Sequence, residues 1–143
     1  MKIKPILFSE IHTSHTSFEV DFEIAYNITF IVGESGVGKS AVFSFLQEMA
    51  AEDSRIRCYN YLDKNRGYKS AIKRAKDKLF VIDNADIMLD DALREYISLD
   101  NKNQYIVVGR NPTGLLLQYD EMYELENHIE GDVTVFTLKK CGI

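Results

Sequence analysis

The feature that most constrains the fold of this 143-residue chain is a glycine-rich loop between two apolar segments. The loop reads GESGVGKS over residues 33–40, after ITFIV and before AVFSFLQEMA. A short continuous apolar run is typical of a strand buried on both faces, and the apolar positions after the loop indicate a helix. A strand, a tight glycine turn and a helix in this order bring backbone N–H groups to a helix N-terminus, where an anion such as phosphate binds.

Further short apolar runs alternate with helical segments along the rest of the chain. The expected strands are 28–32, 56–62, 79–82 and 105–108, with 133–138 closing the sheet. The expected helices are 39–51, 67–76, 89–97 and 113–119, with Asp86 near the start of the third as its cap. Because such βαβ units need a right-handed helical crossover, we expect an α/β fold, a three-layer sandwich with a mainly parallel central sheet.

The N-terminal segment has a different pattern. Residues 18–24 alternate strictly between apolar and acidic side chains, which predicts a strand with one buried face. With the apolar segment 3–8 before it, this strand predicts an antiparallel hairpin ahead of the main fold. We therefore expect a single domain over 1–143, with the hairpin in 1–27 and the core in 28–143.

Composition excludes several classes of protein. No apolar run approaches the roughly 20 residues that a membrane-spanning helix needs, and the first apolar run is too short for a signal peptide. Cys58 and Cys141 have no spacing typical of a metal site, so reduced thiols are expected. These observations predict a cytoplasmic protein with no membrane partner.

The loop matches the pattern G-x-x-x-x-G-K-[ST] in full, which chance produces in well under about 1% of chains of this length. In this pattern the lysine, Lys39, reaches the β- and γ-phosphates of a nucleotide, and the serine, Ser40, binds Mg²⁺. The predicted nucleotide-binding residues are Gly33, Glu34, Ser35, Gly36, Val37, Gly38, Lys39, Ser40 and Ala41.

A second metal ligand is expected at the end of a neighbouring buried strand. Asp83 follows the apolar run LFVI, which would bring its carboxylate to the carboxyl edge of the sheet, facing Mg²⁺ through water. Asp83 and Ser40 are therefore the predicted metal ligands, and Lys39 and Asp83 are predicted to be catalytic.

GESGVGKS and LFVID resemble the Walker A and Walker B motifs of P-loop NTPases. The strand YIVVG, followed by Arg110 and Asn111, resembles the inserted strand of the ATPase branch that includes AAA+ and ABC-like proteins. The resemblance implies a nucleotide-binding core over 28–143, with ATP and Mg²⁺ as cofactors. It also implies that Asn111, or failing it Arg110, senses the γ-phosphate.

Other branches of the family fit less well. No D-x-x-G motif follows Asp83, and no N-K-x-D motif is present, so ATP is favoured over GTP. The chain also lacks an LSGGQ-like ABC signature and has no room for an AAA+ lid with its sensor arginine. A catalytic arginine would come from Arg94, Arg110 or another molecule.

Asn84 occupies the position after the Walker B aspartate, where AAA+ and ABC proteins have a catalytic glutamate. An amide can hold a water molecule but cannot accept its proton, so Asn84 predicts slow or partner-dependent hydrolysis. Asp86, Glu34 and Asp63 are the carboxylates that could substitute.

The charge of the chain is uneven. Residues 55–78 contain nine Lys/Arg and two Asp and carry a charge of +7. Because the net charge of the chain is −5, the remaining residues carry −12. Within this segment Lys69, Lys73 and Lys76 fall on one predicted helical stripe. The segment 64–78 is a solvated face or a surface for nucleic acid or an acidic partner.

Three functions remain open at this point. The first is an ATP- and Mg²⁺-binding NTPase, a slow or partner-dependent hydrolase that acts as a nucleotide-dependent module with a protein partner or as a homo-oligomer. The second is a P-loop kinase that phosphorylates a small molecule or a protein. The third is an ATP-binding protein that does not hydrolyse ATP.

Overall fold

A computed structural model of the chain describes residues 3–33, 38–65 and 67–141. The strands in these ranges are β1 (Glu10–His15), β2 (Phe18–Glu23), β3 (Ile28–Val32), β4 (Ile56–Tyr59), β5 (Leu79–Ile82), β6 (Gln104–Gly109), β7 (Met122–Glu130) and β8 (Val133–Lys140). The helices are α1 (Lys39–Glu52), α2 (Tyr68–Arg74), α3 (Ala85–Met88) and α4 (Asp91–Leu99), with 3₁₀ turns η1 (Tyr61–Asp63) and η2 (Tyr119–Glu121).

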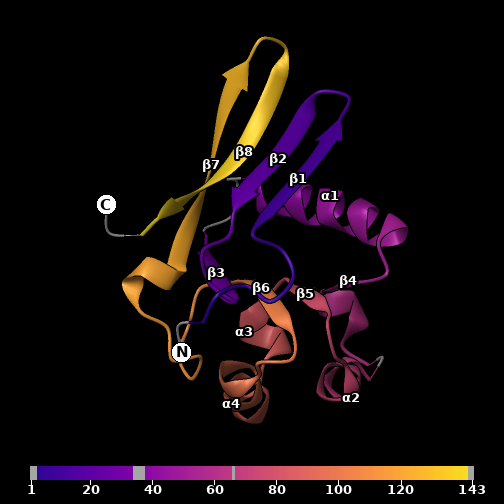
Figure 1. Ribbon diagram of the computed structural model, residues 1–143, viewed down its shortest axis with the longest axis vertical. Helices are drawn as coiled ribbons and strands as arrows, with labels where there is room; N and C mark the ends of the chain where they lie inside the picture. Colours follow the sequence, from indigo (N-terminus) through magenta and orange to yellow (C-terminus); the bar gives the residue numbers. More distant parts are fainter. Residues whose placement is uncertain (1–2, 34–37, 66, 142–143) are drawn as a thin grey trace.

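The strands join in one mixed sheet with the form of a half-barrel, in the order β1-β2-β8-β7-β3-β6-β5-β4 (Figure 1). Strands β7, β3, β6, β5 and β4 pair in parallel. The hairpins β1–β2 and β7–β8 are antiparallel, and the pairing of β2 with β8 joins them side by side. We call β3 to β6 with the helices the core half, and β1, β2, β7 and β8 the hairpin half.

The predicted three-layer sandwich with a mainly parallel central sheet is wrong. The hairpin β7–β8 brings antiparallel pairing into the sheet, which is mixed. The N-terminal hairpin does not stand ahead of the sheet, because β2 pairs with β8 and extends it. The hairpin half also lacks the second helical layer, since the apolar cluster under α2, α3 and α4 contains no residue of β1, β2 or β8.

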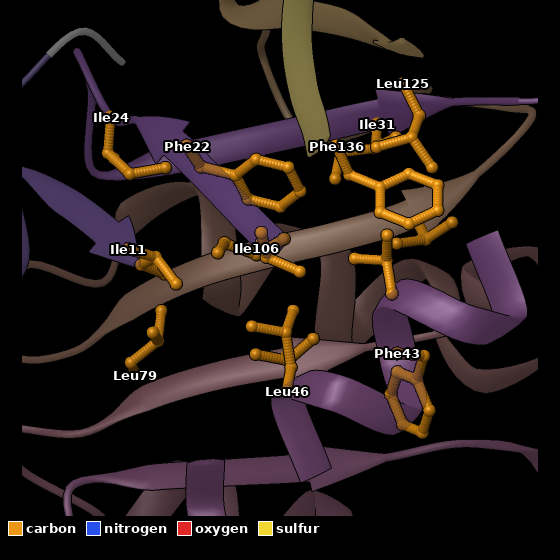
Figure 2. Packing of buried hydrophobic residues seen from close by; sticks show 14 of the residues in the cluster. Ile11, Phe22, Ile24, Ile31, Phe43, Leu46, Leu79, Ile106, Leu125 and Phe136 are labelled. Atoms are coloured by element: carbon orange, nitrogen blue, oxygen red, sulfur yellow. The ribbon is translucent and has the colours of Figure 1, made fainter. Parts of the chain in front are cut away.

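Helix α1 covers one face of the sheet across both halves. Phe43 and Leu46 of this helix pack in one buried cluster with Phe22 of β2, Ile106 of β6 and Phe136 of β8 (Figure 2). On the opposite face, α2, α3 and α4 bury mainly the core half, in a second cluster that includes Phe30, Phe80 and Tyr105. Strand β6 is therefore buried along its whole length.

Several predicted elements are confirmed. The helix expected over 39–51 is α1, and the strands expected over 28–32 and 79–82 are β3 and β5. The expected strands 105–108 and 133–138 lie within β6 and β8, and the alternating segment 18–24 contains β2.

The predicted strand over 3–8 is wrong, and the partner of β2 is β1 instead. A side chain holds this segment to the core half, because the N–H groups of Leu7 and Phe8 donate to Gln104 Oε1 at 3.1 and 2.8 Å. The expected strand 56–62 ends at Tyr59, since Asn60 starts η1 by accepting the N–H of Leu62. These corrections arise from side-chain hydrogen bonds that compete with strand pairing.

The helix boundaries also differ in places. The helix expected at 89–97 begins at Asp91 and is capped by Asp90, whose Oδ1 accepts the N–H of Leu93 at 2.8 Å, whereas Asp86 lies inside α3. No helix forms over 113–119, because Gly114 and Leu116 have positive φ angles of 85° and 56°. Helix α2 ends at Arg74, so the third lysine of the predicted stripe lies beyond it.

No helix within residues 3–33, 38–65 and 67–141 is long and apolar enough to cross a membrane.

Candidate functional site

The candidate site lies where the parallel strands of the core half end. Because β3, β6, β5 and β4 run in the same direction, their carboxyl ends meet at one edge, where ligands bind in open sheets with parallel strands. A cavity of about 720 Å³ opens at this edge. It is lined by Gly38, Lys39, Ser40, Phe43, Ser44, Gln47, Asn60, Tyr61, Asp83, Asn84, Asp86, Ile87, Val108, Gly109 and Arg110.

One end of the cavity is the start of α1. Gly38 precedes the helix with φ of 94°, in the left-handed region that favours glycine. A Cβ added to it would meet Phe136 Cε1 at 2.6 Å, so this turn lies directly against β8. Among the described residues no side chain caps the helix, and its first turn carries no acidic residue, so the positive end of the helix dipole at this turn is not neutralised by them.

Lys39 and Ser40 begin α1 and line the cavity. Lys39 Nζ donates to the carbonyl of Gly33, the residue that follows β3. Ala41 follows in the same first turn. The predicted loop residues Glu34, Ser35, Gly36 and Val37 lie outside the described residues, as does Arg66 of the basic segment.

Asp83 follows β5 and lines the same cavity. Its N–H donates to the carbonyl of Tyr59 at 2.9 Å, and its Oδ1 accepts the N–H of Asn84 at 2.9 Å. No ion pair of its carboxylate occurs in the described part of the chain. The structure thus brings together three residues that the sequence singled out: Lys39, Ser40 and Asp83.

Asn84 is the next residue in the cavity wall. Its φ of 53° is left-handed, a conformation that asparagine tolerates better than most residues, and it starts α3. The amide therefore sits beside Asp83, at the position where the sequence predicted a water-holding group rather than a proton acceptor.

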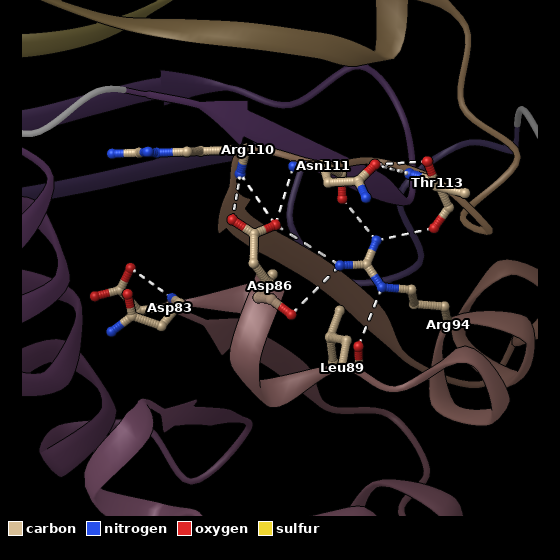
Figure 3. Close-up of polar contacts among 9 residues, drawn as sticks. Asp83, Asp86, Leu89, Arg94, Arg110, Asn111 and Thr113 are labelled. Atoms are coloured by element: carbon tan, nitrogen blue, oxygen red, sulfur yellow. Dashed lines mark hydrogen bonds and ion pairs between the residues drawn. The ribbon is translucent and has the colours of Figure 1, made fainter.

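Asp86 and Arg94 fasten the loop after β6 to the helices (Figure 3). Asp86 accepts the N–H groups of Arg110 at 3.1 Å and Asn111 at 3.0 Å. Arg94, only 6% exposed, donates to the carbonyls of Leu89, Ala85, Asn111 and Thr113. Both residues hold backbone in place, so buried Arg94 is not a mobile arginine at the cavity.

Asn111 and Arg110 have different surroundings. Asn111 Oδ1 accepts the N–H and the hydroxyl of Thr113, and Asn111 is not among the cavity-lining residues. Arg110 lines the cavity, and in Figure 3 its side chain extends away from Asn111, toward the side on which Asp83 lies. Of the two predicted sensor positions, Arg110 lines the cavity and Asn111 does not.

Two other predicted groups lie apart from this chemistry. Asp63 accepts the N–H of Asn60 at 2.9 Å as part of the η1 cap and does not line the cavity. Burial raises the pKa of the Cys58 thiol to about 12, which leaves it protonated and a poor nucleophile at neutral pH. Among the described residues, no three His, Cys, Asp or Glu side chains converge in a metal-binding group.

The sequence reasoning missed the far wall of the cavity. Ser44 and Gln47 follow Ser40 at helical spacing on α1, and Asn60 and Tyr61 come from η1. The spacing of 40, 44 and 47 could have placed the first two beside the loop. Nothing local in the sequence connects η1 to α1.

The basic segment is partly neutralised in the structure. Lys69 forms an ion pair with Asp90 at 2.7 Å and Arg55 one with Asp53 at 2.8 Å. The pair with Lys69 lowers the pKa of Asp90 and raises that of Lys69. None of the segment's lysines or arginines that the structure describes lines the cavity.

No family model matches this chain, and no curated protein is similar enough to it to serve as a relative.

Proposed function

We propose that this protein binds ATP with Mg²⁺ in the cavity at the start of α1 and hydrolyses it slowly or only with a partner. The observation that carries the proposal is the convergence of Lys39, Ser40 and Asp83 on one cavity from two different strand ends. The proposal depends on this local arrangement and on the loop sequence. It does not require the sandwich fold that the sequence suggested.

The phosphates would lie against the first turn of α1. Its uncapped N–H groups and the Lys39 ammonium supply positive charge there. The loop carbonyl that Lys39 now contacts is a neutral acceptor, so a phosphate oxygen is a stronger partner for the ammonium group.

The residues present fit Mg²⁺ as well. Mg²⁺ is commonly held by one or two protein oxygens together with phosphate oxygens and water, and it does not need a cage of several carboxylates. Ser40 offers a hydroxyl and Asp83 a carboxylate that forms no ion pair with another described residue, both on the same cavity. The Mg²⁺ would neutralise phosphate charge when bound.

The same wall supports slow turnover. Asn84 cannot take a proton from water, and the carboxylate of Asp86 is engaged by two backbone N–H groups. Arg110 is the cation on the opposite wall that would contact the terminal phosphate. A partner that supplies a base or repositions Asp86 would then raise the rate. The preference for ATP over GTP rests on the absence of guanine-reading motifs in the sequence.

The test is a titration of the purified protein with ATP and GTP in the presence of Mg²⁺, followed by product analysis. We expect ATP to bind, Lys39→Ala and Asp83→Asn to weaken binding by about tenfold or more, and free phosphate to appear slowly. Lys140→Ala and Asp91→Asn serve as matched controls, because both residues are exposed and lie outside the cavity.

Each variant is checked for folding by its unfolding transition. Absence of Mg-ATP binding by the wild-type protein would overturn the proposal. Tight binding with no phosphate release would reduce it to an ATP-binding protein, and phosphate found on an added acceptor would change it to a kinase.

A further inference from the structure

The cavity continues past Asp83 to η1. The N–H of Asp83 donates to the carbonyl of Tyr59, so Asn60 and Tyr61 start directly beside the proposed metal ligand. Helix α1 forms the facing wall through Ser44 and Gln47, one and two turns after Ser40. We call this part of the cavity, lined by Ser44, Gln47, Asn60, Tyr61 and Ile87, the η1 end.

The η1 end differs in chemistry from the phosphate end. None of its five lining residues carries a charge, whereas the rest of the cavity has Lys39, Asp83, Asp86 and Arg110. Tyr61 and Ile87 are 56% and 59% exposed, so much apolar surface stays open to a ligand. The amide of Gln47 has no partner within the described residues, and Asn60 uses only its amide oxygen, for the η1 cap.

This combination suits a planar, uncharged ring with a hydrogen-bonding edge. Aromatic side chains stack on nucleobases, and asparagine and glutamine amides pair with base edges through one donor and one acceptor. A charged ligand would find no opposite charge at this end and would lose hydration.

The direction in which ATP binds decides whether the η1 end holds the base of ATP or a separate molecule. In the proposed function the loop would hold the phosphates, and Ser40 and Asp83 would hold Mg²⁺ near the β- and γ-phosphates. Asp83 lies beside η1. If Asp83 holds the metal, the γ-phosphate would be nearer to η1 than the nucleoside of ATP. The η1 end then remains open for a different molecule.

We infer that the η1 end is a binding subsite for a second, uncharged nucleoside-like ligand, held beside the γ-phosphate of ATP by Tyr61, Gln47 and Asn60. The inference rests on the proposed function for the direction of the nucleotide. The chemistry of the subsite itself depends only on its lining residues.

The experiment is calorimetric titration with adenosine, guanosine, cytidine and thymidine, each with and without Mg²⁺ and a non-hydrolysable ATP analogue. We expect at least one nucleoside to bind saturably alongside the analogue. Tyr61→Ala should weaken nucleoside binding by about tenfold or more, with Gln47→Ala weakening it less. Tyr61→Phe keeps the stacking ring and should retain most of the affinity.

Leu62→Ala is the matched control, because Leu62 is the neighbouring exposed residue and does not line the cavity. Equal losses from Tyr61→Ala and Leu62→Ala, or no nucleoside binding at millimolar concentration, would overturn the subsite. Competition between nucleoside and analogue, with Tyr61→Ala weakening ATP but not tripolyphosphate, would show that the η1 end holds the base of ATP itself and would also overturn it.

Lys39→Ala separates this inference from the proposed function. It should weaken the ATP analogue and leave nucleoside binding in place. If the wild-type protein binds a nucleoside in a Tyr61-dependent manner but not the analogue, the proposed function fails and the subsite stands.

Discussion

The strands of the core half and of the hairpin half are buried to different extents. Strand β6 is buried at all six positions, because helices cover both of its faces. Strand β7 is exposed over its last five positions, where the hairpin extends beyond the helices (Figure 1). The candidate site lies in the core half, where parallel strand ends and helix starts converge on one edge.

Helix α1 links the two halves. It carries Lys39 and Ser40 at its start and packs on strands of both halves through one cluster. Phe136 of β8 lies against Gly38, so the hairpin half supports the turn from which the phosphate end is built. The hairpin half thus serves as a wall for α1. Four predictions test this comparison.

The largest difference is expected between two isoleucines. Ile106 in β6 is 0% exposed and Ile129 in β7 is 75% exposed. Ile106→Ala should lower the free energy of unfolding by about 3–4 kcal/mol, because the space left by the missing side-chain atoms is closed in by packing on both faces of the sheet and cannot collapse. Ile129→Ala should change it by less than about 0.5 kcal/mol. Urea unfolding measures both, and similar losses at the two sites would contradict the comparison.

Next in size is the removal of the buried arginine that fastens the core half. Arg94→Ala leaves the carbonyls of Leu89, Asn111 and Thr113 without their donor, at a cost of about 2–4 kcal/mol in unfolding free energy. Arg110→Ala is the control, with an expected change within about 0.5 kcal/mol, because Arg110 is exposed. An Arg94 variant as stable as the control would show that the loop after β6 holds its position without this network.

A smaller effect is expected at the contact between the halves. Gly38→Ala imposes a left-handed φ on alanine and a clash with Phe136, for a loss of about 1–3 kcal/mol. Adding Phe136→Leu should recover the part due to the clash and leave the part due to φ. Thermal unfolding of the single and double variants checks this. If the double variant loses as much stability as the two single variants together, or more, the result would argue against the clash.

The smallest effect is a pH dependence at the turn after α1. Arg55 hydrogen-bonds Asp53 and lowers the pKa of that carboxyl from 3.8 to about 2. Because the folded pKa is the lower one, the stabilisation is present above about pH 4 and is lost as the pH falls from about 4 to about 2. Solvent screening limits it to less than about 1 kcal/mol.

Asp53→Asn should therefore lower the unfolding free energy at pH 6 and have little effect at pH 2. Asp21→Asn in the hairpin half is the matched control, as Asp21 lies 3.9 Å from His12 on an exposed surface. A pH dependence of the same size in both variants would show that the Arg55 pair contributes nothing specific.

Part of the site could be predicted and part could not. The loop pattern identified Lys39 and Ser40, and a carboxylate after a buried strand identified Asp83, because each signal lies within a few adjacent residues. Which residue senses the γ-phosphate stays a prediction. Asn111, the first choice, hydrogen-bonds Thr113, and Arg110, the alternative, lines the cavity. The sequence does not tell which of two adjacent loop residues points its side chain into a cavity.

The strand β7 was not predicted, although Tyr123, Leu125 and Ile129 alternate with polar residues in a pattern typical of a strand, interrupted by Asn127. The sandwich prediction failed with it, since β7 and β8 form the hairpin that makes the sheet mixed. Alternating apolar residues therefore indicate a strand with one buried face as well as a continuous apolar run indicates a fully buried one.

The sequence by itself determined the local order of strand, glycine loop and helix, and the identity of the strands that helices cover on both faces. These properties depend on glycine conformations and on apolar periodicity over a few residues. Only the tertiary structure decided that β2 pairs with β8 and that Tyr61, Gln47 and Asp83 share a cavity. Such contacts join residues far apart in the chain, and they form only when packing closes the long loops between them.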